Sequence, residues 1–205
     1  MLTFEQFLVE AANRGEAVNT LFEERLFDLV GILHKITDIL VAAKIDHELI
    51  GGLAVLIHVE EANPEHATLT RDVDLMVRRA DLERIKTAAA ANGFHFRHAA
   101  GVDMLIFGDT SSTKNAVHLV FSGEKVRPNY SDATPPIEPE RKQIHGKEVR
   151  VIPVVDLIRM KLTSFRLKDQ VHIKALEAAG LITPTVENAL TTELAARLKH
   201  VRETE

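Results

Sequence analysis

The chain has 205 residues, of which 45% are hydrophobic, 27% are charged and none is cysteine. This length suits one domain with at most a small appendage, and the composition excludes a disordered chain, a collagen-like fibre, a disulfide framework and a thiolate metal site. The first residues have no signal-peptide pattern, and no window approaches 18 consecutive apolar residues. We therefore expect a soluble, cytoplasmic protein without a membrane partner.

Helices are predicted where apolar residues recur at helical spacing between capping and breaking residues. In chain order they are a short helix from Thr3, a long amphipathic helix over 20–44, a helix over 53–62 that Asn63-Pro64 ends, a helix from a cap at Asp81 to Asn92-Gly93, and three helices over 154–167, 169–178 and 185–201. Gly180 fits the end of the second of these three, and Thr183-Pro184 fits the start of the third.

Strands are predicted where apolar and polar residues alternate between turn signals. They cover residues 46–50, 73–77, 94–98, 102–107, 116–121 and 148–152. Residues 122–146 are polar and rich in proline, so we interpret them as a long loop. The order of elements predicts an α/β (α+β) fold, with a mixed sheet flanked by helices in residues 1–152 and a C-terminal helical segment in 153–205.

The net charge of -5 conceals an uneven distribution. Residues 1–61 hold 11 acidic and 4 basic residues, whereas residues 141–168 hold 8 basic and 2 acidic residues. The basic stretch is interpreted either as a site for an anionic ligand or as a solvated face. The chain has no tryptophan, which weakens the case for an aromatic platform that stacks nucleic-acid bases.

Asp72 and Asp74 carry the strongest chemical signal. They are two residues apart on a predicted strand, which places both carboxylates on one face. Mg²⁺ prefers oxygen ligands and is typically held by one or two carboxylates together with substrate phosphates. The alternative is an exposed strand face that carries two aspartates without function.

Gly51 and Gly52 stand between a predicted strand and a predicted helix. A glycine pair at this position lets backbone N–H groups approach a phosphate at the helix N-terminus. An ordinary tight turn is the alternative. Together the two features form a phosphate cradle followed, about 20 residues later, by a metal-binding strand.

These motifs resemble a known family. GGLAVLIHV followed by TRDVDLMV resembles the opening motifs of the DNA-polymerase-β-like nucleotidyltransferase superfamily, and LIRMKLTSFRLKDQVHIKAL resembles the later motifs of its abortive-infection toxin-like (AbiEii-type) branch. The resemblance implies a nucleotidyltransferase fold and a Mg²⁺-dependent transfer of an NMP group from an NTP such as ATP. The acceptor, which could be a small molecule, a tRNA or a protein, cannot be read from the sequence.

The resemblance also implies residue roles. Gly51 and Gly52 would cradle the nucleotide phosphates, Asp72 and Asp74 would bind Mg²⁺, and Lys161 would neutralise phosphate charge. Asp169 would orient Lys161 or polar groups beside the nucleotide. The alternatives are a solvated helix lysine for Lys161 and a helix N-cap for Asp169.

Two histidines depart from the family pattern. His118 stands where many members place a third carboxylate, with Asp103 as the nearest acidic alternative, and His172 stands where the resemblance leads one to expect aspartate. A neutral imidazole at His118 could act as a general base or ligate a softer metal, or it could be a core-edge histidine with a backbone partner. The departures motivate a second hypothesis, a catalytically inactive nucleotide-binding or interaction module.

The remaining candidates are weaker. His58 and His66 flank a loop and are expected at the surface, whereas Lys125 and Arg127 could reach phosphates or an acceptor, or lie in a solvated loop. The ten histidines motivate a third hypothesis, a histidine metal site with hydrolytic chemistry, although no H-x₃-H spacing supports it. Walker A, H-E-x-x-H and G-x-S-x-G motifs are absent from the sequence, so those enzyme classes have no support.

Overall fold

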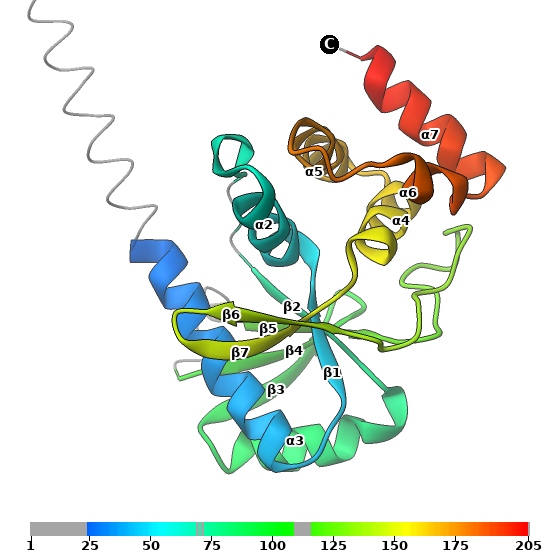
Figure 1. Ribbon diagram of the computed structural model, residues 1–205. Helices are drawn as coiled ribbons and strands as arrows, with labels where there is room; N and C mark the ends of the chain where they lie inside the picture. The colour runs from blue at the N-terminus through cyan, green and yellow to red at the C-terminus, as the bar shows by residue number, and fades with distance from the viewer. Residues whose placement is uncertain (1–23, 69, 71, 109–115, 205) are drawn as a thin grey trace, which may run out of the picture.

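A computed structural model describes residues 24–68, 70, 72–108 and 116–204 (Figure 1). Its centre is a seven-stranded sheet with the strand order β3-β4-β5-β2-β1-β7-β6. The strands are β1 (His47–Ile50), β2 (Val73–Val77), β3 (Phe94–Ala99), β4 (Val102–Phe107), β5 (Ala116–Phe121), β6 (Glu140–Ile144) and β7 (Lys147–Val151). All six predicted strands are therefore confirmed, and β6 is an addition.

The sheet is mixed, as predicted. β1 pairs with β2 antiparallel and with β7 parallel, and β2 pairs with β5 parallel. The outer pairs β3–β4, β4–β5 and β6–β7 are antiparallel. The two central strands, β1 and β2, thus bring the turn after β1 and the start of β2 to the same end of the sheet.

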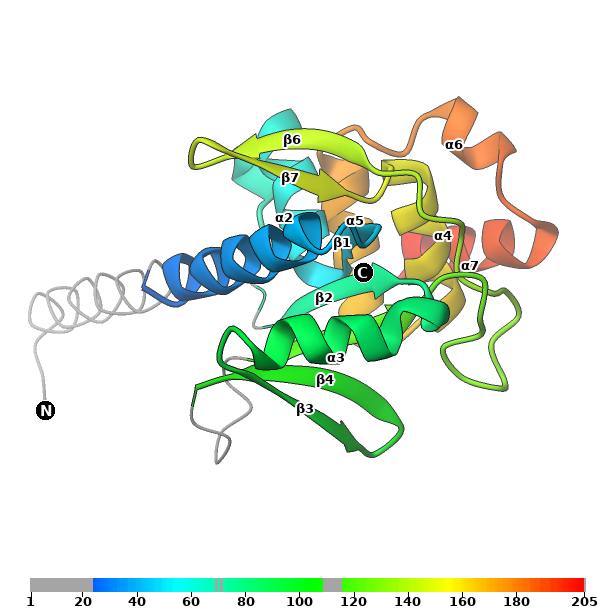
Figure 2. The same ribbon diagram turned by 90° about the horizontal axis from the view of Figure 1, so that it is seen from below.

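Helices cover both faces of the sheet. They are a helix described over residues 24–42, α2 (Gly51–Ala62), α3 (Leu82–Ala90), α4 (Val154–Ser164), α5 (Leu167–Ala178), α6 (Pro184–Asn188) and α7 (Thr192–Glu203). In Figure 1, α2, α4 and α5 gather above the sheet and contact one another. Figure 2 shows the helix over 24–42 and α3 in front of the sheet, on its other side.

One hydrophobic core spans these layers. It includes Ile36 and Leu40 from the first helix, Leu75 from β2, Leu157 from α4 and Leu198 from α7, all fully buried or nearly so. The C-terminal helices therefore pack into the same core as the sheet. None of the helices in the described ranges is both long and apolar enough to cross a membrane.

Several element boundaries differ from the predictions. The interpretation of 122–146 as loop is wrong at its end, where β6 forms. The sequence ERKQI has no alternating apolar face, and this edge strand forms through backbone pairing with β7. The predicted helix over 185–201 is two helices, α6 and α7, because Thr191 begins a new helix as its N-cap. The predicted helix from Thr3 lies outside the described residues.

Two predicted side-chain roles are also wrong. Asp81 precedes α3 but makes no capping hydrogen bond, and its carboxylate instead accepts a hydrogen bond from Arg84. His58 is buried on α2, where its Nε2 lies 2.8 Å from the carbonyl oxygen of Ile152. By contrast, Thr183 caps α6 through the backbone N–H of Val186, as its position before Pro184 predicted.

Candidate active site

Asp74 lies at the centre of the sheet, on β2. In the strand register it is opposite Ile50 of β1 and His118 of β5. Its carboxylate is about a quarter exposed, so a ligand can reach it. Asp72 is the residue immediately before β2 and is close enough to His118 for its charge to help raise the pKa of that histidine. Both predicted carboxylates therefore lie at one end of β2.

The turn between β1 and α2 approaches Asp74 so closely that only glycine fits. Gly51 has a φ of +75°, and a Cβ built on it would lie 2.0 Å from Oδ2 of Asp74. A Cβ on Gly52 would lie 2.5 Å from the hydroxyl of Thr70. The N-cap of α2, Ile50, provides no side-chain cap, which leaves the first N–H groups of the helix available to an anion.

His118 hydrogen-bonds directly to Asp74. Its Nδ1 lies 3.1 Å from Oδ1 of Asp74, and a carboxylate accepts, so Nδ1 donates; in the neutral form of the ring, Nε2 carries the lone pair. This hydrogen bond raises the pKa of His118, while burial opposes the rise and the charges of Asp74 and Asp72 add to it. The imidazole thus occupies the position beside the β2 carboxylate, as its place in the sequence predicted.

The acidic alternative, Asp103, is outside this site. Met104, not Asp103, is opposite His118 in the register of β4 and β5, so Asp103 points to the other face of the sheet. There its carboxylate pairs with Nδ1 of His98 at 2.6 Å. Lys125 and Arg127 are exposed in the loop after β5, and in the described part of the chain no contact joins them to Asp74.

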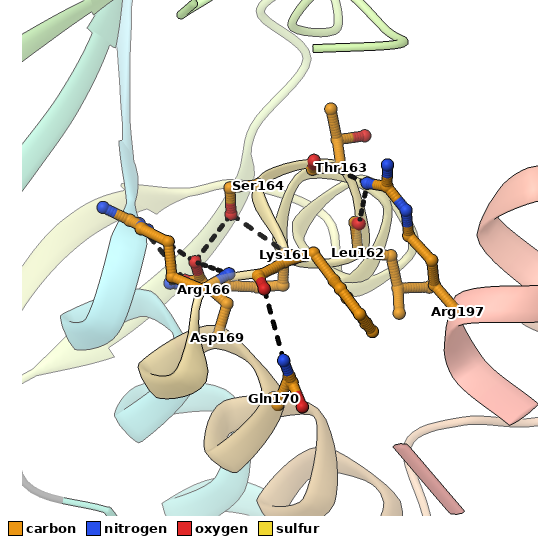
Figure 3. Close-up of polar contacts among 9 residues, drawn as sticks. Lys161, Leu162, Thr163, Ser164, Arg166, Asp169, Gln170 and Arg197 are labelled. Atoms are coloured by element: carbon orange, nitrogen blue, oxygen red, sulfur yellow. Dashed lines mark hydrogen bonds and ion pairs between the residues drawn. The ribbon is translucent and has the colours of Figure 1, made fainter. Parts of the chain in front are cut away.

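Lys161 and Asp169 meet at the corner between α4 and α5 (Figure 3). Lys161 Nζ lies 3.2 Å from Oδ1 of Asp169, and their side chains are only 6% and 0% exposed. Lys161 is thus not a solvated lysine. It is also near enough to Asp74 for the two charges to interact. Asp169 thus holds the ammonium group of Lys161 in place, which is compatible with the first of the two roles that the resemblance implies for it.

Asp169 accepts hydrogen bonds from several donors at this corner. Ser164 Oγ donates to Oδ2 over 2.7 Å, the backbone N–H of Arg166 donates over 3.2 Å, and the Arg166 guanidinium donates to both carboxylate oxygens. Burial alone would raise the pKa of Asp169, but the Arg166 hydrogen bond, the charge of Lys161 and the Ser164 hydrogen bond outweigh it and lower the pKa to about 2. The N-cap of α5 is Arg166, so the interpretation of Asp169 as an N-cap is wrong.

Arg166 was not identified as a site residue from the sequence. The only signal was its position three residues before Asp169, which places the two side chains on one helical face. Arg197 of α7 was missed as well. Its guanidinium donates to the carbonyl oxygens of Leu162 and Thr163 over 2.8 and 2.7 Å and thereby ties the C-terminal helix to the end of α4 (Figure 3).

His172 lies against the glycine turn rather than in solvent. It is buried on α5, and its Cε1 is 3.5 Å from the position of a Cβ on Gly52. Burial, together with the charge of Lys161, lowers the pKa of His172 to about 4, so the ring is neutral near pH 7. Its Nδ1 is buried without a hydrogen-bond partner among the described residues.

The donor set fits one kind of metal ion. Within the described ranges, no group of three histidine or carboxylate side chains converges closely enough to enclose a metal by itself. Asp72 and Asp74 supply two hard oxygen donors beside a backbone turn that is open to an anion. This arrangement fits Mg²⁺, which commonly takes one or two carboxylates and completes its shell with phosphate oxygens and water.

Comparison with known proteins identifies the fold. No family model and no curated protein matches the sequence. Among solved structures, ANT(2'')-Ia in complex with adenylyl-2''-tobramycin is 14% identical, with a TM-score of 0.52 over 84% of this chain and 96% of that chain. An antigenic nucleotidyltransferase-like protein from Paracoccidioides brasiliensis is 18% identical, with a TM-score of 0.56 over 85% and 87% of the two chains.

A third similar structure is the Megavirus polyadenylate synthase, which is 10% identical with a TM-score of 0.55. The match covers 89% of this chain but only 39% of that chain. The three similar proteins are described as a protein holding an adenylylated antibiotic, a nucleotidyltransferase-like protein and a polyadenylate synthase. This chain therefore has the nucleotidyltransferase fold.

Proposed function

We propose that the protein is a Mg²⁺-dependent nucleotidyltransferase that moves an NMP group from an NTP to an acceptor. The observation that carries the proposal is the convergence of three features on Asp74. The Gly51 backbone lies against its carboxylate, His118 hydrogen-bonds to it, and the buried Lys161 is near enough to interact with its charge. Carboxylates, an open helix N-terminus and a buried cation suit a metal-bound triphosphate.

Each residue has a role in this proposal. Asp72 and Asp74 would hold Mg²⁺, which when bound offsets the negative charge of the phosphates and orients them. The first N–H groups of α2, exposed by Gly51 and Gly52, would donate to phosphate oxygens. Lys161 would neutralise further phosphate charge, and Asp169 holds its ammonium group in place.

His118 would act on the acceptor. Asp74 accepts a hydrogen bond from Nδ1 of His118, so in the neutral ring the Nε2 lone pair would take a proton from an attacking hydroxyl. The new bond would form between that hydroxyl oxygen and the α-phosphorus, and the bond from the α-phosphorus to the leaving pyrophosphate would break. The proton would reside on Nε2 until solvent removes it.

The candidate acceptors are those of proteins with the same fold. A solved structure with this fold holds an adenylylated antibiotic, and another is a polyadenylate synthase, so small molecules and RNA are both candidate acceptors, as are proteins. ATP is the first donor to test. The Lys161–Asp169 corner supports the abortive-infection toxin-like (AbiEii-type) branch and hence a toxin–antitoxin-like role.

The decisive experiment measures label transfer from NTPs radiolabelled at the α-phosphate. Each NTP is incubated with Mg²⁺ and with small-molecule, tRNA and protein acceptors. We expect transfer by the wild type and its loss in Asp72→Asn and Asp74→Asn. Asp103→Asn is the matched control, because this aspartate also lies beside a histidine but on the other face of the sheet, and it should retain activity. Undetectable binding of NTP and Mg²⁺ by calorimetry would refute the proposal.

A catalytically inactive nucleotide-binding or interaction module is the second candidate. The observation that favours it is that two histidines, His118 and His172, occupy positions where the family resemblance implies carboxylates. This candidate predicts nucleotide or partner binding that depends on Lys161 but no transfer to any acceptor. Turnover that is lost in Asp74→Asn would eliminate it.

A further inference from the structure

The buried corner between α4 and α5 carries unequal charges. Lys161 and Arg166 both pair with the single carboxylate of Asp169. Two cations on one anion leave an excess of one positive charge, and the Asp169 side chain and Lys161 are almost completely buried. Lys161 and Arg166 therefore share one carboxylate, and the exposed part of the Arg166 guanidinium can pair with a further anion.

The Arg166 guanidinium has donors to spare. Nε donates to Oδ2 of Asp169 over 2.6 Å and Nη2 donates to Oδ1 over 3.2 Å. These two bonds hold one edge of the planar group, and 46% of the side chain remains exposed. The described contacts of Arg166 leave Nη1 and the second proton of Nη2 for a ligand. Asp169 thus presents the guanidinium rigidly, which suits recognition of a phosphate.

Arg166 lies within electrostatic reach of Asp74. Burial would lower the pKa of Arg166, but the hydrogen bond and charge of Asp169, with smaller contributions from Tyr130 and Asp74, raise it. Asp74 also acts on Lys161. Arg166 and Lys161 therefore both lie within electrostatic reach of the carboxylate that faces the Gly51 turn.

A second observation points to a ligand at the same place. The N-terminus of α2 has no side-chain cap, and beside it lies the buried His172 with an unpartnered Nδ1. A buried polar atom without a partner is rare in folded proteins, and a bound group is one of its explanations. Because the ring of His172 is neutral, it does not repel a phosphate, as an aspartate at this position would.

We propose that Arg166 is a phosphate-binding residue which, with Lys161 and the N-terminus of α2, binds the triphosphate of a nucleotide without requiring a divalent cation. This inference rests on the proposed function, since it names a further residue of that site. The first turn of α5 is closed by the backbone of Arg166, whose N–H donates to Asp169 and whose carbonyl oxygen accepts from the N–H groups of Asp169 and Gln170. The guanidinium is thus available for binding.

The test is calorimetric titration of the full-length protein with ATP and, separately, with inorganic triphosphate, each in excess EDTA. We expect wild-type binding and a loss of about tenfold to hundredfold in affinity for both ligands in Arg166→Gln, as for the removal of a charged hydrogen bond. Arg78→Gln is the matched control. It removes an arginine that is paired with Asp46 and similarly exposed, but follows the opposite end of β2, and its affinity should equal that of the wild type.

Circular dichroism would show whether Arg166→Gln fails to fold, and in that case a second variant tests the inference. Arg166→Lys keeps the charge but cannot contact Asp169 with two nitrogens and a phosphate at once, so its affinity should fall by about threefold to tenfold. Unchanged affinity in either folded variant overturns the inference, as does a wild type that binds neither ligand in EDTA. Binding in EDTA without label transfer in Mg²⁺ would leave this inference standing and refute the proposed enzymatic function.

Discussion

Replacing Asp169 with asparagine should destabilise the protein strongly. The carboxylate accepts hydrogen bonds from Lys161, Ser164 and Arg166 within a fully buried position. Asparagine keeps the size of the side chain but removes its charge, so Lys161 is left buried without a counterion. The loss is therefore larger than that of an ordinary hydrogen bond.

The magnitude follows from the pKa of Asp169. It is about 2 in place of 3.8, which corresponds to about 2 kcal/mol of preference for the charged form in the folded state. This value already includes the charge of Lys161 and the hydrogen bonds from Arg166 and Ser164. The expected loss is therefore about 2–3 kcal/mol, close to the lower end of the cost of breaking a buried ion pair.

Urea unfolding of wild type and Asp169→Asn at a series of pH values measures this loss. Because the folded pKa lies below the unfolded value, the stabilisation is complete above pH 3.8 and is lost as the pH falls toward 2. The two proteins should thus differ most at neutral pH and converge in acid. Asp81→Asn, which breaks the surface pair with Arg84, is the control and should cost less than about 1 kcal/mol. Equal losses in the two variants at neutral pH would refute the reasoning.

Two further substitutions test the turn and the core. Gly51→Ala should lower the free energy of unfolding by about 1–3 kcal/mol more than Gly180→Ala and should abolish nucleotide binding. Both glycines have a φ of +75°, but only a methyl group at position 51 meets Asp74. Equal losses of stability in urea unfolding would contradict the close contact. Burial raises the pKa of Glu48 to about 7, so the wild type loses stability as the pH rises through that value. Glu48→Gln should therefore raise the free energy of unfolding by up to about 3 kcal/mol at pH 8 and by little near pH 4.5. A difference that stays constant between these pH values would show that Glu48 titrates normally.

Local patterns were sufficient for most of the secondary structure. The alternation in VDLMV and AVHLVF predicted β2 and β5 because one period-2 pattern decides both the strand and its buried face. β6 was missed because an edge strand forms through its neighbour's backbone and needs no apolar pattern of its own. The predicted end of α4 at residue 167 is three residues beyond its actual end at Ser164, because the chain turns at Phe165, a non-glycine residue with a φ of +48°.

The candidate site was predictable where its motif is contiguous. Gly51 and Gly52 follow a strand directly, and Asp72 and Asp74 stand two residues apart where another strand begins. This local spacing is enough to indicate the chemistry. Arg166 was not predictable, because many arginines lie near an aspartate in sequence. Only the packing of α4 against α5 makes it and Lys161 share one buried carboxylate.

The sequence by itself determined six of the seven strands of the sheet, the glycine turn, the pair of aspartates and the distribution of charge, because each depends on residues a few positions apart. The tertiary structure alone decided that His118 hydrogen-bonds to Asp74, that Asp103 faces the other side of the sheet, and that a buried lysine and a half-exposed arginine of the basic stretch share Asp169. These features depend on contacts between residues far apart in the sequence, on strand register or on helix packing. Their energies depend on burial and on partners that no local pattern contains.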